Sequence, residues 1–140
     1  MRLLAVDADD LKIVSAAVQD AIAQVGDIRF DAAAHSLDLL LNRFRWEHGD
    51  RKQGGERVRA ALRLSSVLSV KAKNMRREPS GAVVSLMALT FESLEAPGGV
   101  ITITFAGGGE LKCAVECIDA RLADMSDPWP TPNRPVHVLD

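Results

Sequence analysis

Basic side chains are concentrated in one stretch of this 140-residue sequence, and they are the residues best suited to bind another molecule. The stretch from Arg43 to Arg77 holds eleven basic and three acidic residues, a local charge of +8, whereas the remaining six basic and sixteen acidic residues sum to −10. Segregated charge creates a surface field that a balanced mixture would not. Guanidinium and ammonium groups bind phosphate and carboxylate oxygens, so this stretch is a candidate docking surface.

Alternation of cations with apolar residues places the cations of this stretch on one side of an extended chain. Arg45 and Trp46 come just before them, where the indole of Trp46 is available to stack on a ligand. The main binding candidates are Arg57, Arg59, Arg63, Lys71 and Lys73. A basic sheet face of this kind is predicted to dock a binding partner.

The overall charge decides between classes of partner. The isoelectric point of the chain is about 5.9, which is low for a nucleic-acid-binding domain. We therefore expect an acidic protein partner or a second copy of the chain, which would make it a homodimer. Nucleic acid or another anionic ligand bound by the same face is the alternative. A structural interpretation is also open, in which solvated arginines protect a sheet edge from aggregation.

Patterns for catalysis or metal binding are weak in this sequence. The glycines at 107–109 precede a strand, not the helix that a phosphate loop needs, so they predict a hairpin turn. Cys113 and Cys117 supply two thiols where structural zinc needs about four ligands, and the three histidines are scattered. No Gly-x-Ser-x-Gly elbow is present. We predict a protein that is not an enzyme and uses no cofactor or metal, with an enzyme of unrecognised site left open.

Length and composition predict one domain over residues 1–140, since 47% of residues are apolar and 26% are charged. No stretch approaches the roughly 18 unbroken apolar residues of a membrane span, and the first residues lack the apolar segment of a secretion signal. Four residues apart in a strand, Cys113 and Cys117 would lie roughly 13 Å apart, beyond disulfide reach. A cytoplasmic protein with reduced thiols is therefore expected.

Helical spacing of apolar residues occurs near both ends of the chain. A helix is predicted from about Ala8 to Val25, capped by Asp7 or Asp9 and ended by Gly26. Its apolar residues are Leu11, Val14, Val18, Ala21, Ile22 and Val25. A second, short helix is predicted from the spacing of Ile118, Leu122 and Met125, before an extended, proline-rich tail at 128–140.

Between the predicted helices lie segments in which apolar and polar residues alternate, and they predict about seven strands of a mostly antiparallel sheet. Residues 28–31 and 37–41 form a hairpin, and a bulge near Asn42 would reconcile the odd-numbered leucines with Phe44. Residues 47–55 form an exposed loop. Residues 57–73 form either two strands or one bent strand, with Leu68, Val70 and Ala72 facing inward. Residues 83–91 form a strand covered on both sides and begin a three-strand meander.

This α+β order of about seven strands and a closing helix is also that of pleckstrin-homology-like rolls, although the N-terminal helix departs from it. Four phrases carry a closer resemblance: LLLNRFRWE (39–47), APGGVITITFAGGG (96–109), ECIDA (116–120) and PWPTPNRP (128–135). They resemble, over nearly the whole chain, the domain-of-unknown-function family numbered 2948, a family of small uncharacterised alphaproteobacterial proteins. The resemblance implies no activity, cofactor or site residue.

Overall fold

Segments in which apolar and polar residues alternate form one antiparallel sheet that folds back on itself. The structure is a computed structural model, and it describes residues 1–46, 55–76, 79 and 81–132. Within these residues it contains eleven strands and one α-helix, so the mostly antiparallel sheet and the N-terminal helix are confirmed and the strand number is higher than predicted. The helix is α1 (Ala8–Val18), and a short 3-10 turn is η1 (Val25–Asp27). The strands are β1 (Arg2–Ala5), β2 (Ile22–Gln24), β3 (Ile28–Asp31), β4 (Ser36–Phe44), β5 (Gly55–Leu64), β6 (Val67–Lys73), β7 (Val83–Ser93), β8 (Gly99–Phe105), β9 (Glu110–Val115), β10 (Ala120–Asp124) and β11 (Trp129–Thr131).

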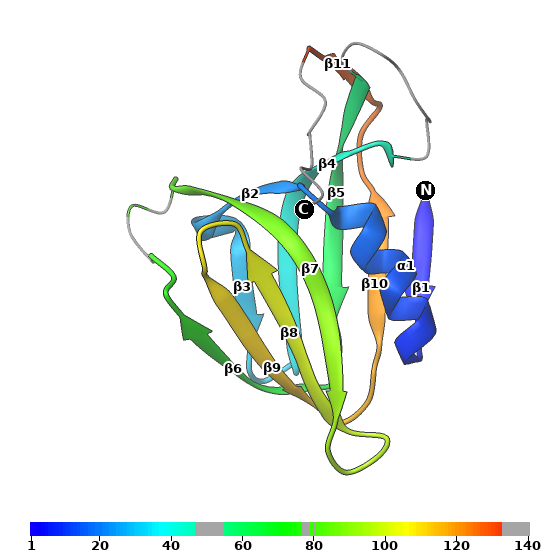
Figure 1. Cartoon of the computed structure of the whole chain (residues 1–140), viewed down its shortest axis with the longest axis vertical. Helices are drawn as coiled ribbons and strands as arrows, with labels where there is room; N and C mark the ends of the chain where they lie inside the picture. The colour runs from blue at the N-terminus through cyan, green and yellow to red at the C-terminus, as the bar shows by residue number, and fades with distance from the viewer. Residues whose placement is uncertain (47–54, 77–78, 80, 133–140) are drawn as a thin grey trace, which may run out of the picture.

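The strand order defines two halves that face each other. The order is β1-β10-β5-β4-β2-β7-β8-β9-β6, with β3 paired to β4 and β11 paired to β5. Short β2 joins the β4 half (β1, β10, β5, β4, β3 and β11) to the β8 half (β7, β8, β9 and β6). Figure 1 shows the β8 half as one layer in front of the strands of the β4 half. The path ends at β1 on one side and β6 on the other, so both are edge strands.

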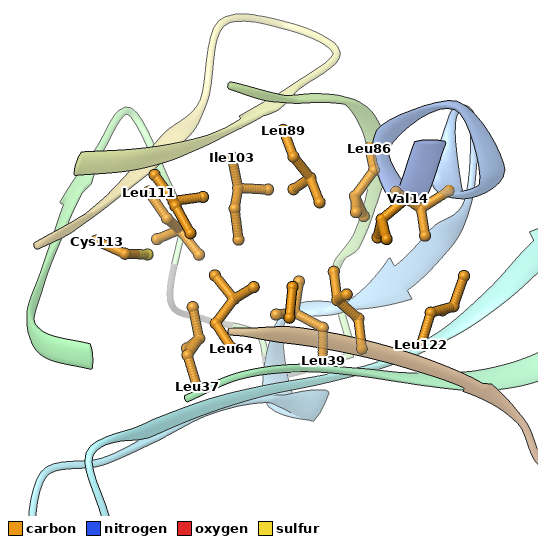
Figure 2. Close-up of a cluster of buried hydrophobic side chains, with 14 of the residues drawn as sticks. Val14, Leu37, Leu39, Leu64, Leu86, Leu89, Ile103, Leu111, Cys113 and Leu122 are labelled. Carbon is orange, nitrogen blue, oxygen red and sulfur yellow. The ribbon is translucent and has the colours of Figure 1, made fainter. Parts of the chain in front are cut away.

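The core fills the space between these two halves. Leu39, Leu64 and Leu122 point into it from the β4 half, and Leu86 and Ile103 point into it from the β8 half (Figure 2). All five are fully buried, and burial of such a side chain stabilises the fold by about 1.5–3 kcal/mol. The sheet therefore closes by packing its two halves over a shared apolar layer.

Helix α1 begins where the sequence predicts and ends earlier. The side chain of Asp7 caps it by accepting a hydrogen bond of 2.7 Å from the Asp10 amide. The helix stops at Val18, and Asp20 takes a left-handed conformation (φ 62°). The predicted end at Val25 is wrong because β2 pairs with β7: the Asp20 amide donates to the Leu86 carbonyl at 2.8 Å, and the Leu86 amide donates to the Ala21 carbonyl at 2.8 Å.

The predicted C-terminal helix is also wrong. Residues 120–124 form β10, which lies between β1 and β5 and hydrogen-bonds to both. Ala120 and Leu122 face the core, and Arg121 faces outward. As a strand, residues 120–124 hydrogen-bond to a neighbouring strand on each side. A helix at this point would leave the facing edges of β1 and β5 unpaired. No helix among the described residues is long and apolar enough to cross a membrane.

Several strand predictions are confirmed, and the expected burial of the strand at 83–91 is corrected. The hairpin of β3 and β4, the meander of β7, β8 and β9, and the glycine turn at 107–109 are all present. The strand at 83–91 is not covered on both sides, because Val83 and Met87 are 62% and 51% exposed on the side away from the core. The predicted loop at 47–55 lies, except for Gly55, outside the described residues.

The stretch 57–73 consists of two strands in different halves of the sheet. Ser66 has a left-handed conformation (φ 57°) and turns the chain from β5 to β6. Within β5 the predicted alternation is confirmed. In β6 a register shift between Val67 and Ser69 leaves Leu68 50% exposed, so its predicted inward orientation is wrong. Beyond this shift Val70 packs against the core, as predicted.

Candidate binding surface

Two of the predicted arginines lie on the outer face of the β4 half and are already paired. Arg63 binds Asp38 through two hydrogen bonds, from Nε at 2.6 Å and from a terminal nitrogen at 2.8 Å. These bonds raise the pKa of Arg63. Arg59 donates to the Asp27 carboxylate at 3.3 Å and to the Asn42 side-chain oxygen at 3.2 Å. Both guanidinium groups are thus paired with carboxylates, one from η1 and one from β4.

Arg57 belongs to an aromatic cluster at one end of the same face. It is half-buried, and its guanidinium donates to the backbone carbonyls of Asp20 at 3.3 Å and Asn42 at 3.1 Å. The guanidinium carbon also lies 5.8 Å from the centre of the Phe44 ring, close enough for a cation–π contact. Burial lowers the pKa of Arg57, and the Asp20 carboxylate opposes that shift in part.

Trp46 completes this cluster. Its ring centre is 4.6 Å from that of Phe44, and its indole nitrogen donates to the Gln19 carbonyl at 2.9 Å. Arg45 forms an ion pair of 3.3 Å with Glu56. Trp46 and Arg45 therefore hold the start of β5 against the end of α1 and of β4, and their polar groups are used within the chain.

Arg43 is a further basic residue of the stretch, and its position in the core was missed. The sequence predicts a bulge near Asn42, yet the pairing of β4 with β5 is regular through Arg43↔Val58 and Phe44↔Arg57. Arg43 therefore takes an inward position, where it is completely buried and ion-paired with Asp124. Arg43 follows Leu37, Leu39 and Leu41 at the same two-residue spacing, and these leucines face the core. This spacing was the signal in the sequence that Arg43 would also face inward.

Lys71 and Lys73 form a separate basic surface on the β8 half. Both are exposed on the outer face of β6, opposite Lys112 and Glu110 of β9. Neither lysine has an ion-pair partner among the described residues, and the same holds for Arg76 just beyond β6. We define Lys71, Lys73 and Arg76 as the β6 cation set.

The predicted single ribbon of cations is therefore wrong. Inner faces of the two halves meet at the core, so their outer faces point in opposite directions. The structure brings Arg57, Arg59 and Arg63 together on one outer face and the lysines of β6 on the other. The turn at Ser66 separates the two groups. Three other basic residues, Arg51, Lys52 and Arg77, lie outside the described residues.

Side chains that could ligate a metal or attack a substrate are not grouped in the described part of the chain. No cluster of three or more His, Cys, Asp and Glu occurs there. Cys113 and Cys117 are unpaired, and burial raises the pKa of Cys113 to about 12, which suppresses its thiolate form. The β6 cation set is thus the feature with the clearest unused binding capacity.

Comparison with known proteins gives one match. A family model described as "Protein of unknown function (DUF2948)" matches residues 1–137. No curated protein and no solved structure matches the chain.

Proposed function

The chain belongs to the DUF2948 family, whose description states no activity, and we propose that it is a non-catalytic interaction module that binds an acidic protein segment along β6. The observation that carries this proposal is the contrast between the two basic surfaces. The arginines of β5 have partners within the chain, whereas the β6 cation set has none among the described residues.

The position of β6 determines how a partner would bind. Among the described strands, β6 pairs only with β9, so one row of its backbone amides and carbonyls lies at the open edge of the sheet. An extended segment can add to such an edge as a further strand, with its backbone providing affinity and its side chains providing specificity. The partner strand would then run beside Lys71 and Lys73.

Charge favours an acidic segment over self-pairing of β6. Carboxylates across from Lys71 and Lys73 would each contribute about 0.2–1 kcal/mol, whereas two copies paired through β6 would bring lysines close to lysines. A second copy would therefore have to bind through one of its acidic surfaces. Sedimentation velocity at several salt concentrations tests that homodimer, and a monomer at micromolar protein in low salt removes it.

A nucleic-acid ligand and a purely protective role for the lysines make different predictions for the same residues. Nucleic acid would be retained through the β6 cation set, so heparin or RNA retention should fall in a Lys71→Glu/Lys73→Glu variant. Lysines that only protect an edge from aggregation would leave the chain without a binding partner, and replacing both with uncharged valine would make it aggregate.

A pleckstrin-homology-like roll and a cytoplasmic location belong to the same proposal. The sheet folded into two facing halves supports the first, with the difference that the single helix of the described chain is N-terminal. Two unpaired cysteines support the second, because disulfides are rare in the cytosol.

Fluorescence anisotropy with a defined probe tests strand addition. The probe is a labelled ten-residue peptide of alternating glutamate and threonine, and its control carries proline in place of each threonine. We expect the wild type to bind the first peptide, and Lys71→Glu/Lys73→Glu to bind it at least tenfold more weakly. The matched variant Lys12→Glu/Arg121→Glu has the same net charge change at exposed positions away from β6 and should bind like the wild type.

Two outcomes would reject the proposal. Equal binding by the two double variants would show that β6 does not hold the peptide. Equal binding of the proline peptide would show that the backbone edge of β6 takes no part, because proline cannot donate the backbone hydrogen bonds of a strand.

A further inference from the structure

An apolar cavity opens between the edges of the two sheet halves. Its volume is about 400 Å³, and it lies between β3 of the β4 half and β6 of the β8 half. Ile28 and Phe30 line it from β3, and Val70 and Ala72 line it from β6. Its volume falls in the range of roughly 300–1,000 Å³ that is usual for small-molecule sites.

This cavity exists because β3 and β6 approach each other without pairing. The His35 carbonyl accepts a hydrogen bond of 2.9 Å from the Val67 amide, and this bond links the halves at one end. Beyond it, β3 pairs only with β4 and β6 pairs only with β9. Buried Leu37 and Leu111 line the cavity from the core side, while Phe30 is 37% exposed. Apolar surface is thus accessible to a ligand and in contact with the core.

The charges at the cavity indicate which polar group a ligand bound there would carry. Arg76 is the single charged residue among the described lining residues, and it has no ion-pair partner in the described chain. The carboxylates of η1 and β3 are occupied: Asp27 binds Arg59, and Asp31 accepts from the Ala34 amide at 3.1 Å.

We infer that the cavity binds a free medium-chain aliphatic carboxylate, with its chain between β3 and β6 and its carboxylate on Arg76. Apolar walls select an aliphatic chain, and the Arg76 guanidinium, which has no ion-pair partner among the described residues, selects an anionic head group that it can bind with two hydrogen bonds. The site uses the inward side of β6 beside the open edge that the proposed protein segment would pair with, so the two sites adjoin each other. The inference goes beyond the proposed function and does not depend on it.

Isothermal titration calorimetry with sodium decanoate, below the concentration at which it forms micelles, tests the site. We expect saturable binding of one decanoate per chain. Arg76→Glu should weaken decanoate binding at least tenfold and leave binding of decanol unchanged. Ala72→Trp, at an exposed lining position, should abolish binding of both by filling the cavity, and Ala72→Glu provides a second variant that places a carboxylate in it.

Control measurements distinguish this cavity from the peptide-binding edge of β6 and from adsorption to a lipid surface. Lys71→Glu/Lys73→Glu should retain decanoate binding to within threefold, so loss of peptide binding and loss of decanoate binding are distinguishable. The inference is overturned if no saturable binding occurs, if folded Ala72→Trp and Ala72→Glu variants bind decanoate like the wild type, or if the chain binds vesicles of anionic phospholipid but not monomeric decanoate.

Discussion

Arg43 on β4 and Asp124 on β10 form a two-point ion pair inside the molecule, although 81 residues separate them in the chain. Nε of Arg43 lies 2.7 Å from Oδ1 of Asp124, and a terminal nitrogen lies 2.8 Å from Oδ2. The amino group of Met1 lies 3.0 Å from Oδ2 as well. Because β5 lies between β4 and β10, this pair ties together strands on both sides of it.

Replacement of Asp124 by Asn should destabilise the fold strongly. Arg43 is completely buried, and the Asn side chain would remove the charge of the carboxylate that binds it through two hydrogen bonds; breaking a buried ion pair in this way typically costs about 3–5 kcal/mol. Urea unfolding at pH 7 measures the free energy of unfolding. Asp127→Asn, at an exposed residue, is the matched control and should leave it unchanged. A loss below about 1 kcal/mol in Asp124→Asn would be the size expected of a surface pair and would contradict the buried one.

The contribution of this pair should disappear in acid. Burial alone would raise the pKa of Asp124, but the hydrogen bonds from Arg43 and from the Met1 amino group outweigh it and hold the pKa below its ordinary value of 3.8. Folding then favours the ionised carboxylate, so its contribution is complete above pH 3.8 and is lost as the pH falls through the folded-state pKa.

Urea unfolding at several pH values checks this sign. The difference in unfolding free energy between the wild type and Asp124→Asn should be the same at pH 7 and pH 5, and it should become smaller as the pH falls below 3.8. A difference that is constant down to pH 2 would mean that the Asp124 carboxylate is not responsible for it.

Gly55 should not tolerate a side chain, because Phe44 occupies the space beside it. A Cβ at Gly55 would lie 2.5 Å from Cζ of Phe44 and 2.7 Å from Cε2, and Phe44 is 1% exposed. Gly55→Ala should therefore cost about 1–3 kcal/mol through overpacking. At Gly81 an added Cβ meets no atom within 4 Å, so Gly81→Ala is the control. Equal melting temperatures of the two variants would refute the packing of Phe44 on Gly55.

The two cysteines should react at very different rates. With a pKa of about 12, only about one Cys113 thiol in ten thousand is ionised at pH 8, and Cys113 is buried, whereas Cys117 is partly exposed. Titration with a disulfide reagent should label one thiol in the folded protein and two in urea. Rapid labelling of both thiols in the folded state would show that Cys113 is accessible.

Alternation in the sequence predicts which side of β5 its arginines occupy but not what they contact. The even-numbered residues of β5 face the core, so Arg59 and Arg63 face outward, as expected from the period of a strand. Their partners, Asp27 and Asp38, belong to η1 and β4, and only the strand order brings them within reach. Periodicity carries no information on strand order, so neutralisation of these arginines could not be anticipated.

The spacing of apolar residues also failed to predict the structure at places where contacts with distant strands determine it. Leu122 and Met125 are three residues apart, a spacing that fits a helix, but residues 120–124 also alternate and have partner strands on both sides. For the same reason Arg43 interrupts an apolar row without a bulge, because a carboxylate from β10 lies opposite it in the core. Contacts between distant strands overrode the local pattern in both places, through backbone pairing in β10 and through a side-chain ion pair at Arg43.

Binding of a defined anion to isotopically labelled protein tests the central claim, that the available cations lie on β6 and not on β5. Pentaglutamate is titrated into the protein at low salt while backbone amide and arginine Nε resonances are followed by NMR. The account predicts saturable shifts at residues 69–73 and at Arg76, with the resonances of Arg59 and Arg63 unchanged. Shifts centred on Arg59 and Arg63 instead would contradict it, because they would show that the pairs with Asp27 and Asp38 do not neutralise that face.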